Sequence, residues 1–148
     1  QRVVNPQELV GVRRLVKLGT GIVRNFFQVG AANALGTIGD VSAVPYLLPL
    51  LKQSNPQLVV WAAFALTRLG HDHFSFLETA LQSTEVDVRR SAILAMQQLG
   101  DSRAIAPLLR VCDDPSRRFE TDSTVAEAAT KALISLGYNI GNLPPSSH

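Results

Sequence analysis

The stretch AANALGTIGD, residues 31–40, recurs three times along the chain with the same apolar positions and the same glycine. The equivalent stretches are AAFALTRLGH at 62–71, AILAMQQLGD at 92–101 and ATKALISLGY at 129–138. Their glycines are Gly39, Gly70, Gly100 and Gly137, spaced by 31, 30 and 37 residues. Each glycine follows apolar residues at helical spacing, as a left-handed residue just after a helix would. The sequence therefore predicts a helical repeat.

An earlier apolar helix precedes each of these stretches, so each unit is expected to be a helix pair. The earlier helices are expected at 42–52, 73–82 and 103–112, and the first unit is expected to use 7–18. The sequence contains no alternating apolar and polar run bounded by hairpin turn residues. We therefore expect an all-α fold in one domain, residues 1–137, with a flexible tail at 138–148. The predicted units are 6–39, 40–70, 71–100 and 101–137.

Two longer phrases carry a family resemblance. AANALGTIGDVSAVPYLLPLLKQSNPQLVVWAAFALTRLG, residues 31–70, and VDVRRSAILAMQQLGDSRAIAPLLRV, residues 86–111, resemble HEAT repeats of the short class named after the phycobilisome lyases. The resemblance covers residues 26–137 well and 6–25 loosely. It implies a right-handed α-solenoid of about four HEAT-like pairs whose second helices line a concave surface. Because the class includes bilin lyase subunits, an iron-dependent hydroxylase and scaffolds, the resemblance specifies fold more than function.

Function is expected where the chain departs from the repeat. The resemblance implies that the outward positions of the second helices carry charged side chains, yet Phe64 and Leu94 occupy the position often held by Glu. Such apolar side chains, rimmed by arginines, are typical of a protein-binding patch. Other interpretations are that they are core residues or bury a homodimer contact. The predicted partner-binding residues are Val60, Phe64, Arg68, Arg89, Arg90 and Leu94.

Two segments, GTGIVRNFF at 19–27 and DDPSRRFETDST at 113–124, are longer than the equivalent connection at 53–57. In a solenoid, equivalent loops emerge on one edge, so these two loops would flank the same side. A solvated polar loop is one interpretation, and an edge-loop site for an anionic or carboxylate group is the other. The residues of this predicted edge-loop site are Arg24, Arg117, Arg118 and Phe119.

No catalytic constellation emerges from the sequence. His71 and His73 lie together, but no further metal ligand follows at a recognisable spacing, and turn residues explain the segment. The hydroxylases in the class depend on His-Glu dipeptides, as the resemblance implies, and this chain has none. Cys112 aligns with two leucines and is expected to be a small buried hydrophobe. No metal, cofactor or catalytic residue is predicted, and an enzyme is the less favoured interpretation.

Composition supports a folded protein without strong polyelectrolyte character. The 148 residues are 46% hydrophobic and 18% charged, with a net charge of +2. The basic side chains do not fall on one equivalent face, so nucleic-acid binding ranks third among the functions considered. The longest strongly apolar run, 59–66, is too short to span a bilayer. A single cysteine fits a reducing, cytoplasmic compartment. Further repeats or another domain before residue 1 are an open expectation.

The favoured function is a non-catalytic scaffold that binds an unidentified protein partner on the concave face of its second helices. Self-association through the same apolar patch is a further expectation. The alternative, from the resemblance, is a bilin lyase subunit or a phycobilisome-related chaperone that handles a phycobiliprotein or tetrapyrrole. In that case Arg89, Arg90 or Arg117 would meet the propionates, and Trp61 and Phe64 would pack against the rings.

Overall fold

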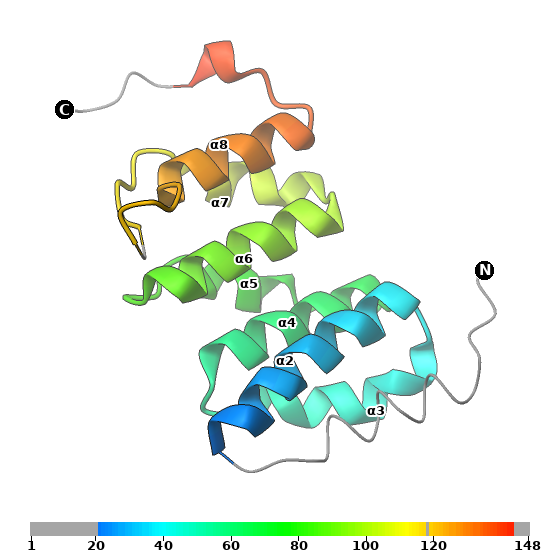
Figure 1. Cartoon of the computed structure of the whole chain (residues 1–148). Coiled ribbons are helices and arrows are strands. Elements are labelled where there is room, and N and C mark those ends of the chain that lie inside the picture. Colours follow the sequence, from blue (N-terminus) through cyan, green and yellow to red (C-terminus); the bar gives the residue numbers. More distant parts are fainter. Residues whose placement is uncertain (1–20, 118, 144–148) are drawn as a thin grey trace. The chain divides into compact units, whose positions relative to one another are not determined.

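The computed structural model describes residues 21–117 and 119–143, with side chains from residue 28 onward (Figure 1). All regular structure in these ranges is helical, which confirms the all-α prediction. The predicted first helix at 7–18 lies outside the described residues. The chain divides into two compact units, residues 1–76 and 77–148.

Unit 1 contains two second helices and one interrupted first helix. Its second helices, α2 (Gly21–Ile38) and α4 (Pro56–Arg68), pack side by side. The chain between them forms η1 (Val41–Ala43), α3 (Val44–Leu47) and η2 (Leu48–Lys52), and α3 and η2 pack against α4.

Unit 2 repeats this arrangement. The short helix α5 (Phe74–Ala80) leads into it, and its second helices are α6 (Val86–Leu99) and α8 (Val125–Ser135), which pack side by side. Between them lie η3 (Ser102–Ala104) and α7 (Ile105–Leu109), and α7 packs on α8. A last turn, η4 (Ile140–Asn142), follows α8 and contacts it.

The repeat glycines end the second helices as predicted. Gly39, Gly70, Gly100 and Gly137 have φ angles of 77°, 91°, 66° and 81°, in the left-handed region that side chains disfavour. The next repeat then begins with a capped turn. The Asp40 carboxylate accepts a hydrogen bond from the Ser42 amide at 2.8 Å, and Asp101 accepts one from Arg103 at 2.9 Å.

Prolines explain why two of the first helices are short or interrupted. Pro45 lies at the start of α3 and Pro49 at the start of η2, and Pro107 lies within the five-residue α7. A proline lacks the backbone N–H that continues a helix and clashes with the preceding turn, so the run breaks into short pieces. The longer second helices therefore carry most of the core.

The close approach of α2 and α4 positions the core of unit 1. A Cβ built on Gly36 would lie 2.7 Å from Ala65 Cα and 2.9 Å from Ala65 Cβ. Only glycine fits at that distance, so the missing side chain of Gly36 sets the separation of the two helices. Leu35, Leu58 and Leu66 are fully buried in this unit.

The interpretation of residues 19–27 as a loop is wrong for residues 21–27, which are helical. Helix α2 begins at Gly21, so Arg24 lies on a helix rather than on an edge loop, and its side chain is outside the described residues. The sequence explains the difference, because Ile22, Val23, Phe26 and Phe27 are apolar residues at helical spacing that extend the pattern of the following turns.

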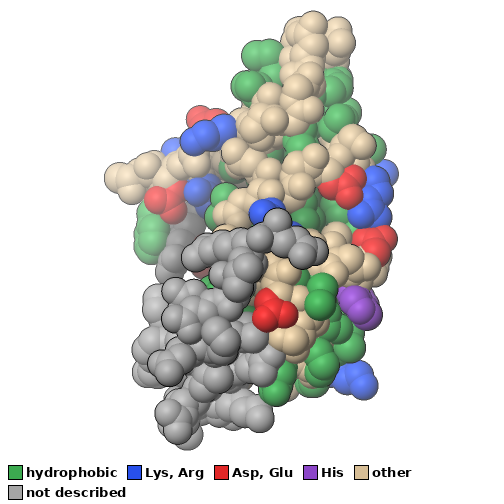
Figure 2. Space-filling model, turned by 90° about the vertical axis from the view of Figure 1, so that its right-hand side faces the viewer, with side chains coloured by type: hydrophobic (Ala, Val, Ile, Leu, Met, Phe, Trp, Pro, Cys, Tyr) green, Lys and Arg blue, Asp and Glu red, His purple; other side chains and the backbone are tan. Residues whose placement is uncertain are grey.

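The described surface carries both signs of charge. On the face drawn in Figure 2, basic and acidic side chains are interspersed, without a broad field of one sign. Within the described part of the chain, no helix is both long enough and apolar enough to cross a membrane.

Candidate functional site

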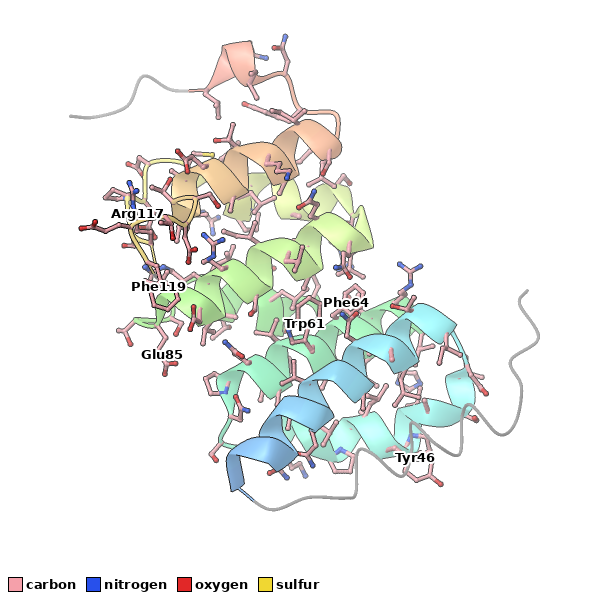
Figure 3. The ribbon with its side chains drawn as sticks, in the orientation of Figure 1. Tyr46, Trp61, Phe64, Glu85, Arg117 and Phe119 are labelled. Atoms are coloured by element: carbon pink, nitrogen blue, oxygen red, sulfur yellow. The ribbon has the colours of Figure 1, made fainter. Side chains whose placement is uncertain are left out.

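Two of the predicted partner-binding residues are core residues. Val60 and Phe64 are each 1% exposed, so the expectation that they face a partner is wrong. The Phe64 ring lies 3.3 Å from the Cβ position of Gly36 and packs edge-on against Trp61, with ring centroids 5.5 Å apart (Figure 3). Because α2 approaches α4 closely at Gly36, it covers the helix face that a wider spacing would leave open.

Arg68 remains accessible. It is exposed in the last turn of α4, where a cation interacts favourably with the helix dipole. Arg68 and Phe64 belong to unit 1, whereas Arg89, Arg90 and Leu94 belong to unit 2. The predicted residues therefore divide between the two units.

Arg89 is committed to contacts within unit 2. Its Nε lies 3.0 Å from Asp114 Oδ2, a contact that is ionic rather than a well-aligned hydrogen bond, and its Nη1 donates to the Ser83 carbonyl at 2.7 Å. The side chain is only 12% exposed. Arg89 is therefore a structural residue, and its predicted place on the rim of a binding patch is wrong.

Arg90 holds the other end of the same loop. Its Nη1 donates to the carbonyl oxygen of Ser123, and Nη2 lies 3.3 Å from the Ser123 hydroxyl. Two consecutive arginines of α6 thus bind the two ends of the 113–124 segment. Arg89 pairs with Asp114, and Arg90 donates a hydrogen bond to Ser123. The backbone adds two bonds, because the Val125 and Ala126 amides donate to the carbonyls of Ser116 and Asp114, each at 2.8 Å.

The tip of this loop carries the described part of the predicted edge-loop site. Arg117 is exposed and its Nη1 donates to the Glu120 carbonyl at 3.0 Å. Phe119, two residues further along the loop, is 58% exposed (Figure 3). Arg118 lies outside the described residues. An anion-binding role for this loop stays a prediction.

Among the described residues, one exposed aliphatic side chain lies on α6 and one on α8, whereas Val41 and Leu48 are exposed in unit 1. Leu94 is 45% exposed on α6, as its predicted role requires, and Ile134 is 52% exposed on α8. Both lie on the solvent side of two helices that pack side by side. We name this surface the α6/α8 face; its residues are Leu94, Gln98, Lys131, Ile134 and Ser135, all exposed.

Sequence reasoning did not single out Ile134. It lies three residues before the repeat glycine Gly137. The residues three before the other repeat glycines are Gly36, Thr67 and Gln97. An isoleucine where the other units have a glycine or a polar residue was the available signal.

The histidine segment and Cys112 have structural contacts in the described part of the chain. No group of three or more potential metal ligands occurs there. The His73 ring packs edge-on against Phe76, and Asp72 Oδ1 accepts a hydrogen bond from the Phe74 amide, so this segment is built as a turn. Cys112 is half-buried, and burial raises the pKa of its thiol, which disfavours the nucleophilic thiolate.

Comparison with known families agrees with this architecture. Residues 47–134 match HEAT repeats, and residues 27–53 match the PBS lyase HEAT-like repeat. The chain belongs to the HEAT repeat family, and the helix pairs of both units are those of an α-solenoid. The chain is similar to Protein YibA of Escherichia coli strain K12 and to that of strain O157:H7, with 31% identity over 101 residues in each case. The match covers 66% of this chain and 35% of either relative.

Proposed function

We propose that the chain is a non-catalytic protein-interaction module that binds a partner protein on the α6/α8 face. The observation that carries the proposal is the joint exposure of Leu94 and Ile134 on neighbouring second helices. A single surface aliphatic residue is ordinary, but two on one face of adjacent helices form the start of an apolar contact area. Membership of the HEAT repeat family supports this function, since HEAT repeats usually mediate protein interactions.

The proposed surface differs from the sequence-based patch in its location. Phe64 is buried, so the apolar centre moves from α4 and α6 to α6 and α8. Arg90 still borders the face, at the N-terminal end of α6, although its guanidinium also holds Ser123. Arg68 is a separate, exposed cation of unit 1. The cytoplasmic location rests on the single cysteine and stays a prediction.

A selection experiment with a matched control tests the surface. Binders are selected on the wild-type chain from a library of randomised amphipathic helical peptides, and each is then measured on two variants. Leu94→Ser/Ile134→Ser removes the exposed aliphatic residues of the α6/α8 face, and Val41→Ser/Leu48→Ser removes exposed aliphatic residues of unit 1. The proposal expects most binders to fail on the first variant and bind the second normally. Binders that fail on Val41→Ser/Leu48→Ser but bind Leu94→Ser/Ile134→Ser normally would contradict the proposal. Self-association of the wild type that is lost only in Leu94→Ser/Ile134→Ser would show that the face binds a second copy of the chain instead.

The bilin-handling alternative rests on the match of residues 27–53 to the PBS lyase HEAT-like repeat. Its expected ring-packing residues, Trp61 and Phe64, are buried, and Arg89 is paired with Asp114, so the described side chains favour it less. Mixing the purified chain with phycocyanobilin is the direct test. A sharpened visible band that is lost in Arg117→Glu would favour this alternative, and an unchanged spectrum would count against it.

A further inference from the structure

The α6/α8 face combines its two aliphatic residues with a cation in a defined register. Leu94 lies six residues before Gly100, and Lys131 lies six residues before Gly137. Both helices run in the same direction, pack side by side and end at left-handed glycines (Figure 1). Equal register therefore places Lys131 across from Leu94. Ile134 follows Lys131 by three residues, which is close to one helical turn.

The spacing suits a single helix lying on the face. Neighbouring helix axes are about 8–10 Å apart, and one turn adds about 5 Å along the axis, so Leu94 and Ile134 are separated by roughly 10 Å. Residues i and i+7 of a partner helix are about 10.5 Å apart. One apolar stripe on such a helix can therefore cover both aliphatic side chains.

Lys131 supplies a positive charge beside the two aliphatic residues of the face. Lys131 is exposed, and no carboxylate in the described part of the chain pairs with it. Glu127, one turn earlier on α8, is an exposed carboxylate at the start of the helix, where its Oε2 accepts a hydrogen bond from the Thr124 amide at 2.7 Å. Asp87 is half-buried and lies about two turns before Leu94. Lys131, between Leu94 and Ile134, is thus the charge that lies next to both aliphatic side chains.

We propose that the occupant of the α6/α8 face is an acidic amphipathic helix of a partner protein, with its apolar stripe on Leu94 and Ile134 and a carboxylate on Lys131. This inference rests on the proposed function and adds the chemistry of the partner. A second copy of the chain fits less well. A two-fold contact through this face would bring like surfaces with their lysines together.

Three labelled, alanine-based helical peptides of about 18 residues serve as probes. All carry leucines at i, i+4 and i+7, and the positions flanking the leucines are Glu, Gln or Lys. Binding is measured by fluorescence anisotropy at about 50 mM and 300 mM salt. The inference expects the Glu peptide to bind about two- to five-fold more tightly than the Gln peptide at low salt, and the Lys peptide to bind weakest.

Reversing the charge of Lys131 tests whether this residue sets the order of peptide affinities. Lys131→Glu should invert the order, so that the Lys peptide binds more tightly than the Glu peptide. Lys52→Glu is the matched control, because it changes the net charge equally at an exposed lysine of η2 and should keep the wild-type order. An order that Lys131→Glu leaves unchanged, or that Lys52→Glu also inverts, would overturn the inference.

The two proposals fail in distinguishable ways. If all three peptides bind equally and Leu94→Ser/Ile134→Ser weakens all of them, the partner chemistry is wrong and the binding face stands. If that double variant binds the peptides as the wild type does, the binding face is wrong as well. Absence of binding by every peptide at millimolar concentration would contradict the acidic-helix inference.

Discussion

Arg89 of α6 and Asp114 of the loop before α8 form an ion pair, with 3.0 Å between Nε and Oδ2. The pair joins the two second helices of unit 2 through the segment between them. The repeat pattern places this arginine at an outward position, but here its side chain is paired with a loop of the same unit. The surface left for a partner is then defined by aliphatic residues and Lys131 rather than by Arg89.

The first prediction concerns pH. Burial alone would raise the pKa of Asp114, but hydrogen bonds from Ser116 and the charge of Arg89 outweigh it and lower that pKa. An aspartate whose folded pKa is below its unfolded value of about 3.9 stabilises the fold above that value and loses this contribution as pH falls through the folded pKa. Asp114→Asn should therefore cost about 1 kcal/mol near neutral pH and almost nothing near pH 2.

Urea unfolding of the wild type and Asp114→Asn at several pH values measures this difference. The exposed Asp113→Asn is the control, and it should change stability little at any pH. A difference between Asp114→Asn and the wild type that does not shrink in acid would show that the carboxylate charge is not what stabilises the loop.

The second prediction concerns the close contact of α2 and α4. Gly36→Ala would place a Cβ 2.7 Å from Ala65 Cα, so the helices must separate, at a cost of about 1–3 kcal/mol in the free energy of unfolding. Gly30→Ala is a matched change on the same helix with no atom within 4 Å, and it should be neutral or stabilise by up to about 1 kcal/mol. Equal effects of the two substitutions in thermal unfolding would disprove the close approach.

The third prediction separates core from surface aromatic residues. Phe64→Ala should lower the free energy of unfolding by about 3–5 kcal/mol, because the ring is buried between helices. Phe119→Ala removes the same side chain at an exposed position and should cost less than about 0.5 kcal/mol. Denaturant unfolding compares the two, and a small cost for Phe64→Ala would restore the surface interpretation of that residue.

The fourth prediction concerns the start of α8. Thr124 and Glu127 form a capping box, in which the Thr124 hydroxyl accepts a hydrogen bond from the Glu127 amide at 3.1 Å and the Glu127 carboxylate accepts one from the Thr124 amide at 2.7 Å. Thr124→Ala should cost about 1 kcal/mol of stability. Thr121→Ala, at an exposed position of the same loop, should have little effect. Similar midpoints for the two variants in urea would contradict the capping role.

Local patterns predicted the helices better than they predicted the site. The end of each second helix depends on one glycine and the few residues before it, so Gly39 and its equivalents could be identified from the sequence. The burial of Phe64 depends on Gly36, 28 residues earlier, and on how closely two helices approach. A helical pattern identifies the faces of a helix but does not fix that distance.

The two arginines illustrate the same limit. Arg89 and Arg90 occupy outward positions of the repeat, and their partners Asp114 and Ser123 come from a longer connection that is special to this unit. Nothing in the repeat pattern pairs residues so far apart in the chain. Ile134 was missed for a simpler reason, since it continues the apolar character of α8 and looks like a core residue in the sequence.

An NMR titration of the isotope-labelled chain with the acidic helical peptide shows directly which residues the peptide contacts. We expect the largest methyl shift changes at Leu94 and Ile134 and amide changes at Gln98 and Lys131, while Val41 and Leu48 remain unchanged. Shift changes confined to unit 1 or to the loop tip at Phe119, with Leu94 and Ile134 unaffected, would contradict this expectation.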